Sequence, residues 1–186
     1  FVTVKMATSL DGSWASARGE SRWITEEEAR NRGGELRGRV DALVTSFRTI
    51  EVDDPLLTAR DGDKLRPHQP RVFVISQRAK PDLSAYKVAR HPGWAEAVKV
   101  DRLVDFARHL YGLDLHDVMV EAGPRLTTAW LDAGLVNEVW LFVNTRFLGG
   151  GPRLEALASG DLKGLPGKLS YLEQVGPSDL FLKLRL

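Results

Sequence analysis

Short apolar segments that alternate with helical segments constrain this sequence more than any other feature. Four of them are rich in β-branched or aromatic residues, as buried strands are: DALVT (41–45), RVFVIS (71–76), DVMVE (117–121) and VWLFV (139–143). A weaker strand candidate, EAVKV (96–100), precedes a helical segment at 101–112 whose apolar residues recur at helical spacing. Strands that alternate with helices predict an α/β protein with a largely parallel sheet.

The two ends of the chain supply further strands. FVTVKMA at the N-terminus alternates as a strand does, and residues 167–186 predict two strands around the turn at Gly176 and Pro177. This antiparallel hairpin should close the sheet. The chain has 186 residues and contains no repeat or linker, so we predict one domain covering 1–186.

Two helices have clear boundary signals. Thr25 and Glu28 form a T-x-x-E capping box, and the helix that they start should run to about Gly38. Gly33-Gly34 inside it indicates either close packing against another element or a local break. A second helix should start at Pro124 and stop at Gly134.

The composition excludes several classes of protein. Hydrophobic residues make up 43% of the chain and charged residues 27%, with a formal net charge of +1, so neither a nucleic-acid partner nor a membrane surface is expected. No cysteine is present, which excludes disulfides, thiolate catalysis and cysteine zinc sites and favours a cytoplasmic setting. The sequence has no Rossmann fingerprint, P-loop or G-x-S-x-G elbow, and its four histidines lack metal-ligand spacing, so no metal is expected.

Several polar residues stand where a ligand could bind, although each has an ordinary alternative. Glu121 ends an apolar strand just before a helix that opens at Gly123-Pro124, and ligands of open α/β sheets bind at the carboxyl ends of strands. Arg37 and Arg60 could bind one anion together or be solvated charges. Lys5, in the first strand, could equally point to solvent.

Two loops are also ambiguous by themselves. TIEVDDPLLTAR (49–60) is either a surface turn that starts at Asp54-Pro55 or the rim of an anion site. FLGGGPR (147–153) is either a flexible turn or a close backbone approach to a ligand or partner.

Taken in order, these segments resemble one known family. They are similar to the reductase domain of bacterial RibD-type riboflavin-biosynthesis enzymes, and the resemblance covers essentially the whole chain. It implies a dihydrofolate-reductase-like fold, a three-layer α/β sandwich with a mainly parallel sheet and an antiparallel C-terminal strand. The segments that carry it are VKMATSLDG, GESRWIT, LRGRVDALVTS, TIEVDDPLLTAR, VEAGPRLTTAWLDAGLVNEV, FLGGG and QVGPSDLFLKL.

The resemblance implies a reaction and its site residues. The reaction is NADPH-dependent reduction of 5-amino-6-(5-phosphoribosylamino)uracil, whose ribose opens and is reduced at C1′ to a ribityl chain. The implied cofactor contacts are Ala7, Trp23, Thr49, Asp53, Ser76, Gly123, Pro124, Arg125, Leu126, Thr127, Thr128 and Ala129. The implied substrate contacts are Lys5, Ser21, Arg37, Leu57, Arg60 and Glu121.

Positioning should dominate such a site, because NADPH itself supplies the hydride. We expect Ser21, Arg37 and Arg60 to hold the ribose phosphate, and Lys5 and Glu121 to hydrogen-bond the pyrimidine. The catalytic candidates are Lys5, Glu121 and Asp53, the last for managing a proton near the opened sugar. Outside the implied set, Arg48 is our hypothesis for NADPH preference, through the 2′-phosphate.

Some alternatives stay open at this stage. The same fold and cofactor could serve the non-deaminated pyrimidine, dihydrofolate or a specialised aminopyrimidine, and a non-catalytic nucleotide-binding domain is a further alternative. The zinc deaminase motifs that usually precede this domain in bacteria are absent, so we expect either an excised reductase domain or a stand-alone reductase. The resemblance also implies a homodimer, for which VWLFV is either an interface strand or a core strand.

Overall fold

The computed structural model describes residues 1–20, 23–77, 81–154 and 164–186. These residues form two compact units. The first comprises Phe1 and Asn31–Ala122, and the second comprises Val2–Arg30 and Gly123–Leu186. The prediction of a single domain concerns both units together and stays a prediction.

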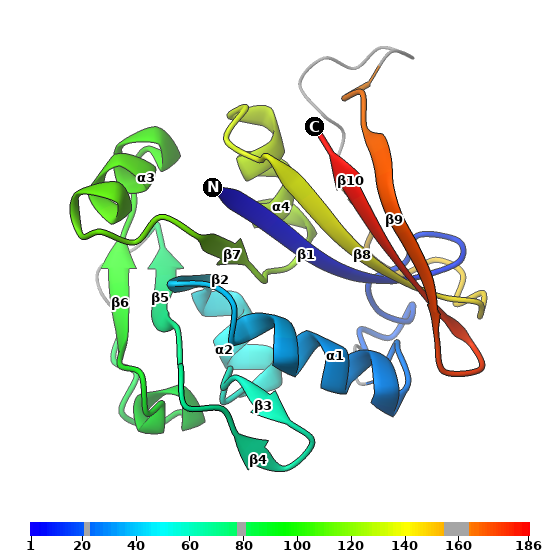
Figure 1. Cartoon of the computed structure of the whole chain (residues 1–186), viewed down its shortest axis with the longest axis horizontal. Helices are drawn as coiled ribbons and strands as arrows, with labels where there is room; N and C mark the ends of the chain where they lie inside the picture. Colours follow the sequence, from blue (N-terminus) through cyan, green and yellow to red (C-terminus); the bar gives the residue numbers. More distant parts are fainter. Residues whose placement is uncertain (21–22, 78–80, 155–163) are drawn as a thin grey trace. The chain divides into compact units, whose positions relative to one another are not determined.

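The first unit contains a parallel sheet of four strands in the spatial order β6 (Ala95–Lys99), β5 (Arg71–Ser76), β2 (Ala42–Ser46) and β7 (Val118–Val120) (Figure 1). These are four of the predicted strands. Val72, Phe73 and Val74 of β5 are fully buried, because a central strand of a parallel sheet is covered on both faces. All four carboxyl ends lie at one edge, where ligands bind in α/β sheets.

Other elements of this unit connect the strands. They are α2 (Phe47–Asp53), β3 (Arg60–Asp61), β4 (Lys64–Leu65), the 3₁₀-helix η1 (Lys87–Arg90) and α3 (Leu103–Gly112). The sequence predicted α3 but missed α2, reading its residues as part of a turn. Ser46 starts α2, since its Oγ accepts the Thr49 N–H at 3.1 Å.

Helix α1 (Glu27–Arg37) is continuous through both glycines. The predicted alternative of a local break is therefore wrong, and a Cβ on Gly34 would lie 3.4 Å from the backbone oxygen of Arg60, an ordinary van der Waals contact that does not by itself require a glycine. The start of the helix is stabilised by Asp179, whose carboxylate accepts the Glu26 N–H at 2.7 Å. The sequence pattern does not predict that contact.

The second unit contains β1 (Val2–Ser9), which pairs in parallel with β8 (Glu138–Asn144), and the hairpin of β9 (Lys168–Val175) and β10 (Asp179–Arg185). Strand β10 runs antiparallel to β8, so the antiparallel C-terminal strand is confirmed. The VWLFV segment lies in β8 between two partner strands and belongs to the core. Helix α4 (Pro124–Asp132) begins at the predicted proline.

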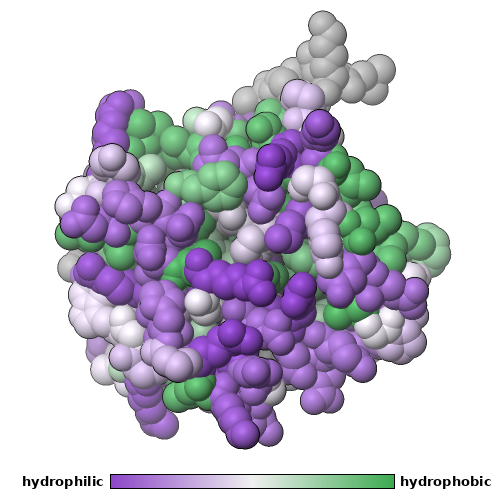
Figure 2. Space-filling view, in the orientation of Figure 1, coloured by the Kyte–Doolittle hydropathy of each residue, from purple (hydrophilic) through white to green (hydrophobic). Residues whose placement is uncertain are grey.

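One face of the molecule is mostly polar. Figure 2 shows hydrophilic residues over much of the face turned to the viewer, with smaller hydrophobic areas among them. Exposed apolar side chains occur on strand β9, namely Leu169, Tyr171 and Leu172. In the part of the chain that the structure describes, no helix has the length and apolar character needed to cross a membrane.

Candidate active site

A bidentate ion pair lies at the carboxyl edge of the first unit. Arg37, the last residue of α1, donates from Nε and Nη2 to the two carboxylate oxygens of Glu121, at 2.8 and 2.9 Å. Glu121 follows β7, and its own N–H bonds to the Val44 oxygen of β2 at 2.9 Å. The side chains are 22% and 10% exposed, so the pair is largely shielded from water.

Glu121 determines the charge state of Arg37. Burial would lower the pKa of Arg37, but the Glu121 carboxylate and its hydrogen bonds outweigh burial and raise that pKa. Arg37 therefore stays cationic. Its charge is balanced by Glu121, an arrangement that the separate roles predicted for the two residues did not include.

Thr58 connects this pair to Arg60. Its backbone oxygen accepts from Arg37 Nη1 at 3.3 Å, and its Oγ1 accepts from Arg60 Nε at 2.7 Å. Among the residues that the structure describes, Arg60 has no carboxylate partner, whereas Arg37 has one. The net positive charge of the cluster is therefore carried by Arg60.

The segment between α2 and Arg60 has an unusual backbone. Asp54 and Leu57 have φ values of 41° and 57°, in the left-handed region that residues other than glycine rarely adopt. The Asp54 carboxylate accepts the Lys87 N–H at 2.8 Å and pairs with Lys87 Nζ at 3.4 Å. Asp54 thus stabilises the turn, as the sequence indicated, while Leu57 and Thr58 are buried beside the arginines.

Three residues implied for the cofactor share this unit. Thr49 and Asp53 belong to α2, which leaves the end of β2, and Ser76 is the last residue of β5. Thr49 Oγ1 lies 2.9 Å from Ser46 Oγ, and Ser76 is buried. The fold therefore places Thr49 and Ser76 near the carboxyl ends of neighbouring parallel strands, whereas Asp53 is at the far end of α2.

His91 is a buried group that the sequence left among ordinary loop histidines. Its Nδ1 accepts the Gly93 N–H at 3.1 Å, so the ring proton of the neutral form is on Nε2. Burial lowers the pKa of His91, the nearby charge of Arg37 acts in the same direction, and the Leu57 carbonyl opposes both. His91 is therefore a neutral neighbour of the Leu57 turn at pH 7.

The second unit holds the other implied residues. Lys5 and Ala7 lie in β1, and Lys5 Nζ is 5.5 Å from the centre of the Phe142 ring. Trp23 is 63% exposed, with the Arg30 guanidinium 4.2 Å from its ring centre. Ser21 lies outside the described residues.

The start of α4 suits an anionic group. Gly123 is the N-cap residue and offers no side-chain cap to the first turn. The Oγ1 atom of buried Thr128 has no hydrogen-bond partner in the described part of the chain. Uncapped N–H groups at a helix N-terminus attract anions.

The glycine loop at 147–153 makes a close backbone approach, but to another segment of its own unit. A Cβ on Gly151 would lie 1.7 Å from the Ala15 oxygen, so only glycine fits. Asp11 accepts the N–H groups of Leu148 and Gly149 at 3.1 and 3.0 Å and pairs with Arg153 at 3.1 Å. The loop is thus attached to the turn after β1.

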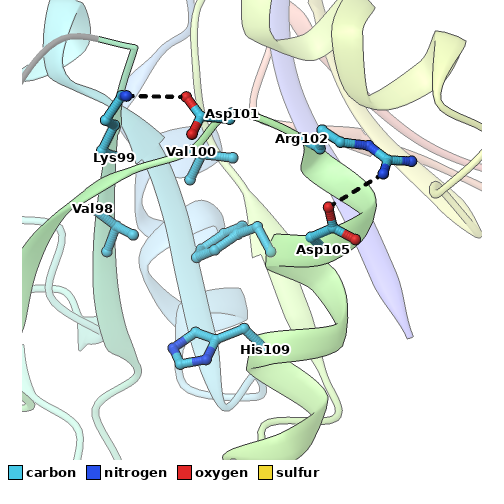
Figure 3. Close-up of a pocket in the computed structure, with 8 residues that line it drawn as sticks. Val98, Lys99, Val100, Asp101, Arg102, Asp105 and His109 are labelled. Carbon is cyan, nitrogen blue, oxygen red and sulfur yellow. Dashed lines mark ion pairs between the residues drawn. The ribbon is translucent and has the colours of Figure 1, made fainter.

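A cavity elsewhere in the first unit contains none of the predicted site residues. It has a volume of about 270 Å³ and lies between β6 and α3 (Figure 3). Lys99 pairs with Asp101 at 3.3 Å, and Arg102 pairs with Asp105 at 3.6 Å. These opposed charges favour no single class of ligand.

Comparison with known proteins shows which family this chain belongs to. Residues 1–163 match the family described as the RibD C-terminal domain. The chain belongs to this family. It is 35% identical to the riboflavin biosynthesis protein RibD of Mycobacterium tuberculosis over 98% of its length, and 30% identical to that of Escherichia coli K12 over 95%. It spans 53% and 58% of those proteins, about half their length.

Solved structures agree with the RibD assignment. The deaminase/5-amino-6-(5-phosphoribosylamino)uracil reductase of Thermotoga maritima matches all of this chain with a TM-score of 0.85 at 25% identity, and the chain covers 56% of that protein. The riboflavin biosynthesis reductase of Saccharomyces cerevisiae matches with a TM-score of 0.73 at 18% identity, covered to 89%, which supports the fold alone. The predicted α/β fold, mainly parallel with an antiparallel C-terminal strand, is confirmed.

The Arg37–Glu121 pair should contribute strongly to stability. Glu121→Ala leaves a largely buried guanidinium without its counter-charge, so the free energy of unfolding should fall by about 2–3 kcal/mol in urea denaturation. The matched control is Glu51→Ala, which breaks the exposed Arg48–Glu51 pair (3.6 Å, 79% and 41% exposed) and should cost less than about 0.5 kcal/mol. Equal losses in both variants would show that the Arg37–Glu121 pair contributes no more to stability than an exposed ion pair.

Asp11 should make stability depend on pH. Hydrogen bonds from Ser9, Leu148, Gly149 and Ser13 hold the pKa of Asp11 well below its usual range, although burial opposes them. A carboxylate with a depressed pKa stabilises the fold above its unfolded pKa, about 4, and this contribution disappears as pH falls below it. The difference in the free energy of unfolding between wild type and Asp11→Asn should be constant from pH 7 to about 5 and should shrink towards pH 2. Urea denaturation at each pH measures this difference. A difference that stays constant down to pH 2 would contradict the prediction.

Proposed function

We propose that this chain reduces the ribosyl group of 5-amino-6-(5-phosphoribosylamino)uracil with NADPH, as a step of riboflavin biosynthesis. The observation that carries the proposal is the cluster of Arg37, Glu121, Thr58 and Arg60 at the carboxyl edge of a parallel sheet. Membership of the RibD C-terminal domain family supports it, as does the name of the Thermotoga maritima reductase.

Arg60 is the group best suited to a phosphate. It is cationic and lacks a carboxylate partner among the described residues, while Thr58 orients its guanidinium through Nε. Arg37 uses three of its five N–H donors on Glu121 and Thr58, so it offers hydrogen bonds but little net charge. A phosphorylated sugar therefore fits this cluster better than dihydrofolate, which has no ribose phosphate.

The chain's own part in the reaction is positioning and proton handling. When bound, the nicotinamide cofactor supplies the hydride, which carries both electrons to C1′. Asp53, at the end of α2, is our candidate for holding the proton that the heteroatom on C1′ takes up as that carbon accepts the hydride. Pyrimidine contacts from Lys5 and Glu121, which the family resemblance implies, are part of the proposal. Good orientation is worth roughly 7–11 kcal/mol of barrier, so positioning is the larger contribution.

The cofactor proposal rests on the start of α4. Its uncapped first turn suits the pyrophosphate of NADPH, and Gly123–Ala129 is proposed as the binding segment. Ala7, Trp23, Thr49, Asp53 and Ser76 are proposed as further cofactor contacts. Arg48, which is exposed and pairs only loosely with Glu51 at 3.6 Å, is proposed to select the 2′-phosphate.

The remaining parts of the proposal concern the whole protein. The chain spans about half the length of its curated relatives, and the Thermotoga maritima protein is both a deaminase and a reductase, so a deaminase domain is proposed as the partner of this one. A cytoplasmic setting and a homodimer are proposed as well. The exposed apolar side chains of β9, Leu169, Tyr171 and Leu172, are a surface that a dimer contact could bury. Light scattering measures the oligomeric state.

Substrate-dependent oxidation of NADPH tests the reaction. The chain is supplied with the deaminated or the non-deaminated ribosylaminopyrimidine phosphate, and loss of the nicotinamide absorbance band is followed. We expect turnover with the deaminated compound, and an Arg60→Ala variant should raise its KM roughly 10- to 100-fold because charge-assisted bonds to the phosphate are lost. Arg39→Ala, which removes an exposed arginine just after the end of α1, is the control and should leave KM unchanged. Oxidation with neither compound would contradict the proposal.

The Arg48 proposal concerns cofactor choice. An Arg48→Ala variant should lose roughly tenfold or more of its preference for NADPH over NADH, because one charged contact to the 2′-phosphate is removed. The ratio of kcat/KM values for the two cofactors measures this. Arg102→Ala, also an exposed arginine of the first unit with an acidic partner, is the control. An unchanged ratio in Arg48→Ala would contradict the proposal that Arg48 selects the 2′-phosphate.

A further inference from the structure

The side chain of Gln69 is fully engaged with the backbone of one nearby segment. Its Oε1 accepts the Ala59 N–H at 2.9 Å, and its Nε2 donates to the backbone oxygens of Ala59 and Arg66, both at 2.8 Å. The amide orientation is fixed by this pattern, because the reverse orientation would place donors against the Ala59 N–H. One side chain thus holds both main-chain groups of Ala59.

Ala59 stands between the two residues that build the arginine cluster. A peptide unit is planar, so the Ala59 N–H shares a plane with the Thr58 carbonyl, and the Ala59 carbonyl shares a plane with the Arg60 N–H. Gln69 therefore fixes the direction of the Thr58 oxygen, which accepts from Arg37 at 3.3 Å. Together with the Arg66 N–H, which also donates to the Ala59 oxygen at 3.0 Å, it fixes the direction in which Arg60 leaves the chain. Ala59 itself is completely buried and has no polar side chain to hold it.

Close packing against Gly93 holds Gln69 in place. A Cβ on Gly93 would lie 2.8 Å from Gln69 Cβ, 2.9 Å from the Gln69 backbone oxygen and 2.7 Å from the Pro70 oxygen, so the two segments approach as closely as a glycine allows. The Gly93 N–H bonds to His91 Nδ1 at 3.1 Å. The Gln69 amide is consequently preorganised before any ligand binds.

We propose that Gln69 is a positioning residue for the phosphate group of the substrate, which it serves by fixing the Thr58–Ala59–Arg60 backbone. This inference rests on the proposed function and assigns to it a residue that touches neither substrate nor cofactor. The physical reason is that a bidentate or charge-assisted contact loses strength when its donor is misdirected.

Gln69→Glu is the test, because it changes two donors into acceptors at almost constant size. The carboxylate still accepts the Ala59 N–H but opposes the Ala59 and Arg66 carbonyls. We expect the KM for the phosphorylated substrate to rise roughly tenfold or more, with kcat and the KM for NADPH changed less than about twofold. The defect should lessen below about pH 5, where the protonated side chain can donate one bond again.

Two comparisons separate positioning from general damage. His68→Ala removes the neighbouring side chain, which bonds to the Val40 oxygen at 2.9 Å, and should leave the substrate KM unchanged. In an Arg60→Ala background, Gln69→Glu should raise KM less than about twofold further, because the group that it positions is gone. Gln69→Met, of similar length and uncharged, should reproduce the KM effect without the recovery at low pH.

The outcomes are distinguishable. If the wild type oxidises NADPH and folded Gln69→Glu and Gln69→Met keep the wild-type KM, the inference is overturned and the proposed function stands. The inference is also overturned if the tenfold rise persists in the Arg60→Ala background. If the wild type shows no turnover, the proposed function is wrong, and the role of Gln69 is then tested by titration with inorganic phosphate alone. Phosphate should bind Gln69→Glu roughly tenfold more weakly than it binds the wild type. Equal affinities would overturn the inference.

Discussion

The bidentate pair of Arg37 and Glu121 is the interaction on which the candidate site depends. Shielding two charges from water is costly, and the cost is offset only when geometry and additional hydrogen bonds are good. Here both carboxylate oxygens are used, and the Glu121 backbone is tied to β2. The pair therefore fixes the end of α1 against the carboxyl ends of two parallel strands, which defines where the segment 57–60 can lie.

Neutralisation of Arg37 gives the site its electrostatic character. Two unpaired arginines side by side would repel each other. With Arg37 balanced by Glu121, one net positive charge remains on Arg60, and Thr58 links the two guanidinium groups through its oxygen atoms. The left-handed conformation of Leu57 brings Thr58 into that linking position, which is a reason for its strain to be tolerated.

The sequence predicts the elements of this fold better than it predicts the contacts. The strands of the parallel sheet were predictable because each is a short apolar run between turn signals, and α4 because proline marks its start. Helix α2 was missed because its seven residues are too few for a periodic pattern, and its only signal was Ser46 as an N-cap. Arg37 and Glu121 were both candidates from their chemical type and position, and family resemblance implied their roles, but their pairing over 84 positions has no local signal.

Gln69 shows why part of a site is invisible in sequence. Its effect comes from its amide, which meets the two peptide groups of a residue ten positions earlier in the chain, and no spacing rule predicts such a contact. Charged residues that could touch a ligand, such as Arg37, Arg60 and Glu121, were at least recognisable as candidates by their chemical type. The residues that aim them are recognisable only from geometry, since any polar side chain in a loop could be solvated instead. Much of what makes an arginine cluster selective is therefore carried by neutral neighbours.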